Sequence, residues 1–167
     1  FSPAAVAALG LADLYAQLSM RVGLGLGGGA IALSSQDTGA GAEASRDEAV
    51  TQALLIGLVA GLPLAAFGLA LGELAIALLG APPDVARLGG LYLAVVLAAA
   101  PADIVAIVGA RALQGTGDTR TPMYVRLLTL PTNVVLNALL IFGLLGFPAL
   151  GIVGAAIGTA VTNTLTG

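Results

Sequence analysis

The stretch that decides the fold is LLTLPTNVVLNALLIFGLLGFPALGIVGAAIGTAVTNTLTG, residues 127–167, in which 41 consecutive positions carry no charged side chain. A helix of about 20 apolar residues crosses a bilayer, so this stretch holds one span and most of a second. The segment GFPALG, residues 146–151, marks the break, and the polar hinge GTGDTRTP, residues 115–122, precedes the stretch. A soluble domain could not cover so much apolar chain with polar surface. We therefore predict a membrane protein.

Composition supports the same class. Hydrophobic residues make up 58% of the chain and charged residues only 9%, against about 25% charged in soluble domains. The absence of Cys and His excludes disulfides, thiol catalysis, zinc sites and a His base. The net charge of −3 provides no basic surface for a nucleic-acid partner. The last apolar run, residues 151–167, reaches about 25 Å as a helix, short of a full span, and we expect the chain to be an internal piece of a larger protein.

Turn and capping signals divide the chain into five apolar helices. The pair Ser45 and Glu48 fits a capping box, Asp84 fits an N-cap, and Thr121 followed by Pro122 fits an N-cap and first helical position. We therefore predict an all-α, polytopic transmembrane helix bundle. Its expected spans are about 3–35, 46–79, 85–113, 122–145 and 151–167.

Arginine placement predicts the orientation of these spans. If the spans alternate, the loops 36–48 and 113–121 share one side of the membrane, and the loops 80–84 and 146–150 share the other. Four arginines flank the first side and only Arg87 lies near the second. The excess of Arg predicts that the first side is cytoplasmic.

Prolines fall inside three of the spans, at Pro63, Pro101 and Pro131. Each removes a backbone hydrogen bond and bends its helix, which a membrane tolerates where neighbours or a cavity satisfy the freed carbonyl. Scattered Gly and Ala are better accounted for by close helix packing. Repeated prolines in mid-span are more typical of transporters, whose interrupted helices line a path.

A polar line follows the fourth span, because Arg126, Thr129, Asn133 and Asn137 are spaced by three and four residues and share one helix face. Thr129 can bond to its own backbone, whereas two Asn amides in hydrocarbon need partners or water. Interhelical hydrogen bonding could account for the line, at only about 0.6–2 kcal/mol per contact. A line of four polar residues favours a water-filled cavity instead.

Asp103 lies well inside the third span, two residues after Pro101. A carboxylate within the membrane is costly and marks a candidate functional site; protonation, or pairing with an Arg near the cytoplasmic end, accounts for it equally well. Tyr92, eleven residues earlier, shares its helix face. A second polar line in the first helix consists of Asp13, Gln17 and Arg21. This line could equally lie near a membrane interface.

These residues together resemble the multidrug and toxic compound extrusion (MATE) family of secondary transporters. The strongest similarity is the segment RALQGTGDTRTP, residues 111–122, which is similar to the family's R-G-x-G-D-T-[RK]-T-P signature. Further matches occur in the same order and spacing along the chain: Ser35-Gln36 with Gly39 to Gly41, Tyr92-Leu93 with Pro101, Asn133 to Gly143, Pro148, Gly151 and Gly154 to Ala156.

The resemblance implies a twelve-helix protein of two lobes, of which this chain supplies helices two to six of the amino-terminal lobe. It also implies export of organic cations coupled to inward H⁺ or Na⁺, without a further cofactor or metal. The expected setting is the plasma membrane, with lipids and a small organic cation as partners and a monomeric full-length protein. The family's cation site implies roles for Tyr92, Asn133 and position 137, with Asn137 standing where an Asp is expected.

Two other functions remain open at this point. One is a lipid-linked oligosaccharide flippase of the same superfamily, which would be expected to have more cationic cavity residues than Arg21 alone. The other is a structural membrane subunit, against which the mid-span prolines and polar faces argue. An enzyme is not expected, since the sequence offers neither a nucleophile–base set nor a metal-ligand cluster. The candidate binding residues are Tyr92, Asp103, Thr129, Asn133 and Asn137.

Overall fold

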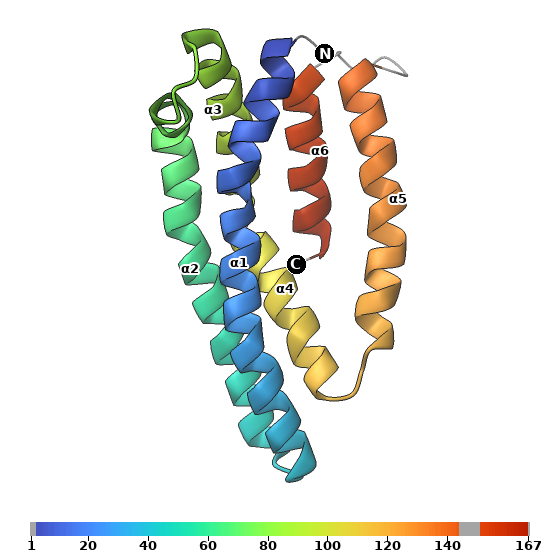
Figure 1. Cartoon of the computed structure of the whole chain (residues 1–167). Helices are drawn as coiled ribbons and strands as arrows, with labels where there is room; N and C mark the ends of the chain where they lie inside the picture. Colours follow the sequence, from blue (N-terminus) through green and yellow to red (C-terminus); the bar gives the residue numbers. More distant parts are fainter. Residues whose placement is uncertain (1–2, 144–150, 167) are drawn as a thin grey trace.

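The computed structural model describes residues 3–143 and 151–166, and the regular structure within them is entirely α-helical (Figure 1). This confirms the predicted fold class. The described helices are α1 (Pro3–Gly39), α2 (Glu43–Leu78), α3 (Pro83–Ala98), α4 (Ala100–Gly115), α5 (Arg120–Phe142) and α6 (Gly151–Thr166).

The third predicted span is two helices rather than one, since α3 and α4 meet at Ala99 with a bend of 46°. Pro101 causes the interruption because it has no backbone N–H to donate to the carbonyl four residues earlier. Pro63 and Pro131, in contrast, lie inside the continuous helices α2 and α5. The sequence predicted a bend at Pro101 but not a break between two helices.

The bend is held by close backbone contact with α2. A Cβ placed on Gly61 would lie only 2.7 Å from the backbone nitrogen of Pro101. Glycine is therefore the residue that lets α2 approach the first turn of α4 at this point. The residues around it are among the most buried of the protein, with Leu97, Ala100 and Ile104 fully inaccessible to solvent.

The helices divide into a four-helix bundle and a pair. Helix α1 packs mainly on α4, α2 mainly on α3, and α5 mainly on α6, which also contacts α3 and α4. Figure 1 shows α6 between the bundle and α5. Helix α5 has no buried residue, so it presents Leu127, Leu128 and other large apolar side chains outward.

By length and apolar composition, α2 and α5 can each cross a membrane, and the bent pair α3 and α4 qualifies as a third span. Helix α1 does not meet the same criterion within the described residues, and α6 provides a shorter apolar segment, Val153–Thr162. The apolar faces of α2 and α5 point away from the protein, as expected for surfaces that contact lipid.

The predicted N-cap residues are wrong at the starts of α2, α3 and α5. At each start another residue occupies the N-cap position, and its side chain makes no capping hydrogen bond. Helix α2 begins at Glu43, before the predicted box, and Glu48 accepts a hydrogen bond from Gln52 instead. Helix α3 begins at Pro83, which places Asp84 in the first turn. At α5 the backbone amides are satisfied by Asp118, which accepts from Arg120 N and Thr121 N.

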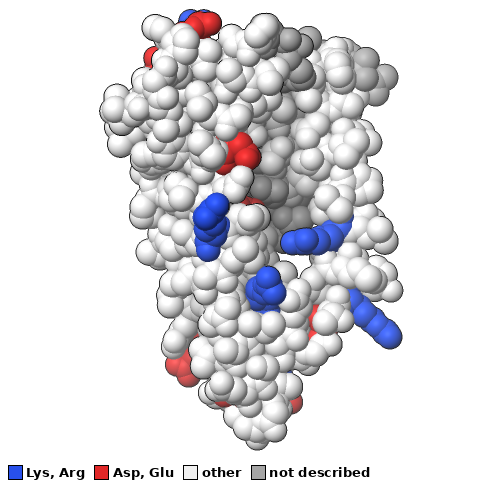
Figure 2. All heavy atoms as spheres, in the orientation of Figure 1, with Lys and Arg blue, Asp and Glu red and all other residues white. Residues whose placement is uncertain are grey.

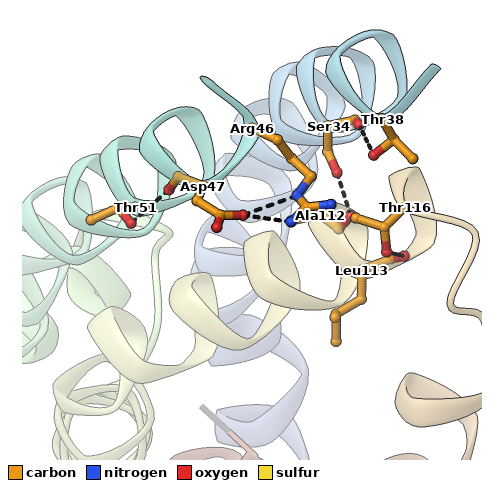
Figure 3. A network of polar contacts seen from close by, with 8 residues as sticks. All are labelled: Ser34, Thr38, Arg46, Asp47, Thr51, Ala112, Leu113 and Thr116. Carbon is orange, nitrogen blue, oxygen red and sulfur yellow. Dashed lines mark hydrogen bonds and ion pairs between the residues drawn. The ribbon is translucent and has the colours of Figure 1, made fainter. Parts of the chain in front are cut away.

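A polar contact joins the end of α1 to that of α4, and further polar contacts lie within α1 and within α2 close by (Figure 3). Ser34 Oγ of α1 is buried and donates to Ala112 O of α4 at 2.8 Å. Thr38 Oγ1 donates to Ser34 O, and on α2 Arg46 forms a salt bridge with Asp47 at 2.8 Å. This network fixes the last turns of α4 against α1.

Alternation of the connections agrees with the predicted topology as far as the described residues reach. The turns after α1 and after α4 lie toward one end of the molecule, and the turn between α2 and α3 lies at the opposite end (Figure 1). The predicted external loop 146–150 lies outside the described residues. Which end faces the cytoplasm stays a prediction.

Candidate functional site

The amides of Asn133 and Asn137 form a hydrogen-bonded pair on α5. Asn137 Nδ2 donates to Asn133 Oδ1 at 3.0 Å, as the spacing of four residues allows. Asn137 Oδ1 is buried and has no hydrogen-bond partner among the described residues. An unsatisfied buried acceptor costs about 1–3 kcal/mol, so a ligand or water that reached this oxygen would recover that cost.

Helix α6 reaches the pair through a glycine. A Cβ on Gly158 would collide with Asn137 Oδ1, and a Cβ on Gly154 would collide with Leu140 O one turn further along α5. The two glycines therefore allow α6 to pack against the face of α5 that carries the asparagines. Gly158 carried no signal in the sequence, because glycine is common in apolar helices wherever two backbones pack closely.

The other two members of the polar line do not join the pair. Thr129 Oγ1 donates to Val125 O at 2.9 Å, which confirms the prediction that it satisfies itself on its own helix. Arg126 is exposed and forms no hydrogen bond or ion pair with the described residues. The spacing predicted a shared face correctly, but only Asn133 and Asn137 interact on it.

Asp103 has a partner on α1. Ser19 Oγ donates to Asp103 Oδ2 at 2.7 Å, and Ser19 is only 5% exposed. Among the described residues, no arginine forms a salt bridge with Asp103, so pairing with an arginine does not account for this carboxylate there. Ser19 was missed by sequence analysis, since a single Ser on an apolar face gives no signal of a partner 84 residues away.

Tyr92 on α3 is partly buried and packs beside the bundle core. Asp13 of α1 accepts a hydrogen bond from Gln17 Nε2 at 2.7 Å, so two members of the α1 polar line are paired. Tyr92 and Asp103 form no hydrogen bond with each other within the described residues.

The candidate residues therefore form two groups. Asp13, Tyr92, Ser19 and Asp103 belong to the bundle, whereas the asparagine pair belongs to α5 and α6. Among the described residues, α1 and α5 are not one of the helix pairs with substantial contact. Figure 2 shows a recess on this face of the molecule, with acidic side chains beside its upper part and basic side chains below it.

Comparison with known proteins agrees with this architecture. The family model described as MatE matches residues 1–139. The chain belongs to the MATE family. It is 31% identical over 143 residues to the probable multidrug resistance protein YoeA of Bacillus subtilis, covering 86% of this chain and 31% of that protein.

Two solved MATE structures share the fold closely. A crystal structure of a MATE point mutant matches with a TM-score of 0.90 at 28% identity, covering 99% of this chain and 36% of that one. An inward-facing multidrug resistance MATE transporter matches with a TM-score of 0.85 at 26% identity, covering 98% and 36%. The chain thus spans about a third of the length of the proteins that it matches.

MATE proteins are multidrug efflux transporters of the membrane rather than enzymes, and the family assignment confirms the resemblance based on residues 111–122. It also accounts for the exposed apolar faces of α2 and α5, which are suited to lipid.

Proposed function

We propose that this chain is helices two to six of the amino-terminal lobe of a secondary exporter. The whole protein would be a monomer in the plasma membrane that expels drugs or organic cations in exchange for H⁺ or Na⁺. Support comes from the multidrug resistance proteins that it resembles. One structural observation carries the site assignment: the buried, unsatisfied oxygen of Asn137, beside Asn133 on α5 and against Gly158 of α6.

The asparagine pair can bind a cation without changing its own charge. The free Asn137 oxygen accepts a hydrogen bond from a substrate ammonium group or from a water bound to it. Its amide group donates to Asn133 Oδ1, which polarises the carbonyl and strengthens it as an acceptor. Because an amide has no titratable proton in the physiological range, this pair selects substrate but cannot take up and release the coupling proton.

Coupling must therefore depend on carboxylates. Asp13 and Asp103 belong to the bundle, and each already accepts one hydrogen bond, from Gln17 and Ser19 respectively. Within this chain Asp103 is the candidate for ion coupling at membrane depth, but Ser19, which donates a hydrogen bond to it, is buried and fixed. We place the main coupling step on a carboxylate outside this chain, with Asp103 in a secondary role.

Transport by the full-length protein in inverted membrane vesicles tests this function. Asn137→Ala removes an acceptor for a charged donor, a contact worth about 1.5–3 kcal/mol, so the apparent KM for a cationic drug should rise at least about tenfold. The pH dependence of transport should stay unchanged. Thr132→Ala is the matched control on the same helix, since Thr132 Oγ1 donates only to Leu128 O of its own backbone.

Two results would contradict the proposal. Wild-type vesicles that accumulate no drug under an imposed H⁺ or Na⁺ gradient would exclude coupled export. An Asn137→Ala protein with an unchanged KM, or with an altered pH profile, would remove the asparagine pair from the substrate site.

A further inference from the structure

Helices α2 and α4 lie close together at the bend and separate toward the end of α4. A Cβ on Gly61 would collide with the first turn of α4, and a Cβ on Gly57 would lie 3.2 Å from Ile104 Cγ2. Further along, a Cβ on Gly109 would meet Leu54 Cδ2 at 3.7 Å, which is an ordinary contact. The widening leaves a groove between the two helices with a volume of about 560 Å³.

This groove has a polar rim and an apolar floor. The rim includes Arg46 and Asp47 of α2 and Thr116, the C-cap of α4, and Figure 3 shows these side chains near the adjoining helix ends. The floor lies one to two turns further along the helices and includes Val50, Leu54 and Leu113. A ligand that fits the groove must therefore combine a charged end with an apolar body.

The rim lies at the level of the lipid headgroups. Charged side chains are frequent at the start of α2, but residues 49–72 carry none. As a helix this uncharged run reaches about 36 Å, enough to cross a hydrocarbon core of about 30 Å. Arg46 and Asp47 come just before the run, whereas Val50 and Leu54 lie within it. A membrane lipid can thus place its headgroup on the rim and an acyl chain on the floor.

Arg46 and Asp47 present opposite charges side by side. Arg46 Nε and Nη2 both donate to Asp47 Oδ1, at 2.9 and 2.8 Å. Within the described part of the chain, Arg46 Nη1 and Asp47 Oδ2 form no further hydrogen bond. The two side chains are 24% and 70% exposed, so both can be reached from outside. The pair offers N–H donors to a phosphate and a carboxylate oxygen to an ammonium group.

We propose that the interfacial groove, defined by the rim Arg46, Asp47 and Thr116 and the floor Val50, Leu54 and Leu113, binds a membrane phospholipid whose headgroup carries a phosphate and a primary ammonium, as in phosphatidylethanolamine. Arg46 contacts the phosphate and Asp47 accepts from the ammonium. A trimethylated headgroup has no N–H to donate to Asp47, and a headgroup without an amine leaves Asp47 beside a second negative charge. Charge complementarity therefore selects this headgroup over the other two.

Lipid binding to the purified full-length protein, measured by native mass spectrometry, tests the proposal. The probes are dioleoyl phosphatidylethanolamine, phosphatidylcholine and phosphatidylglycerol, which differ only in the headgroup. The wild-type protein should bind phosphatidylethanolamine most tightly. Asp47→Asn should raise the apparent Kd for this lipid about threefold, the scale of an exposed ion pair, and leave that for phosphatidylcholine unchanged. Arg46→Gln should weaken all three lipids, because each carries the phosphate.

Glu43→Gln is the matched control, since Glu43 is an exposed carboxylate in the first turn of α2 that does not line the groove. It should alter binding of none of the three lipids.

Equal binding of the three lipids by the wild-type protein, or an Asp47→Asn variant that keeps the wild-type preference, would overturn the proposal. So would the absence of bound lipid, because another segment of the full-length protein would then fill the groove. Free phosphoethanolamine is the last probe. If it competes as well as the intact lipid, the site recognises a soluble headgroup and the lipid assignment is wrong. The readout is binding rather than transport, so failure of the export function would leave this result intact.

Discussion

Replacing Gly61 by Ala should disrupt the bend between α3 and α4. The new methyl group would lie 2.7 Å from the nitrogen of Pro101 and 3.0 Å from its Cβ, closer than real Cβ atoms pack. Both contacts are to atoms at or next to the backbone, so no flexible side chain can move away. Either α2 must separate from α4 or the bend of 46° must change.

The size of the effect follows from two opposing terms. Inserting a methyl group into a well-packed core costs about 1–3 kcal/mol, and contact with a proline ring in a helix turn places Gly61 at the upper end of that range. Alanine gains about 1 kcal/mol over glycine in a helix interior. We expect a net loss of about 2 kcal/mol in the free energy of unfolding.

Denaturant titration of the purified full-length protein in detergent, followed by circular dichroism, measures this loss. Gly25→Ala is the matched control, because a Cβ on Gly25 meets no atom within 4 Å, and it should leave stability unchanged or raise it by up to about 1 kcal/mol. If Gly61→Ala is as stable as Gly25→Ala, the close packing of Gly61 on Pro101 does not hold the bend.

Three further outcomes are expected. Hydrogen bonds from the Thr121 side chain and amide hold the pKa of Asp118 below its usual 3.8. The ionised Asp118 therefore stabilises the start of α5 fully above pH 3.8. This stabilisation is lost as the pH falls through the lower pKa that Asp118 has in the folded protein. Amide exchange in the first turn of α5 should accelerate there, and Asp118→Ala should abolish this pH dependence. Gly117→Cys should resist an impermeant thiol reagent in intact cells, and labelling from outside would reverse the topology. Ser19→Ala should lower the free energy of unfolding by about 1–3 kcal/mol, since Asp103 Oδ2 loses its donor, whereas an exposed serine of α1 should tolerate the same change.

Features that depend on helix periodicity could be predicted from the sequence. A spacing of four residues places Asn133 and Asn137 side by side whatever the tertiary structure, and Thr129 reaches its own backbone for the same local reason. The apolar content likewise indicated the fold class, because a helix satisfies its backbone groups within one segment and the apolar runs are long enough for helical spans.

Features that depend on contacts between distant helices could not be predicted. The bond from Ser19 to Asp103 joins residues 84 positions apart, and nothing local to either residue specifies it. The same holds for Gly158, whose role is defined only by the approach of α6 to Asn137. Capping signals failed for another reason: α2 and α3 begin after Ala42 and Pro82, whose side chains cannot cap a helix, so a nearby Ser or Asp did not mark the start.

Helix α5 is attached to the rest of the protein mainly through α6. Among the described residues it packs on α6 and only weakly on α4, whereas α6 contacts both α3 and α4 of the bundle. The asparagine pair therefore belongs to a unit that can shift without breaking the core around Leu97 and Ile104. Asn137 Oδ1 is buried where Gly158 of α6 approaches it, so a ligand or water reaches this oxygen only if α5 and α6 move apart. We therefore expect binding at the asparagine pair and the position of α5 to be linked.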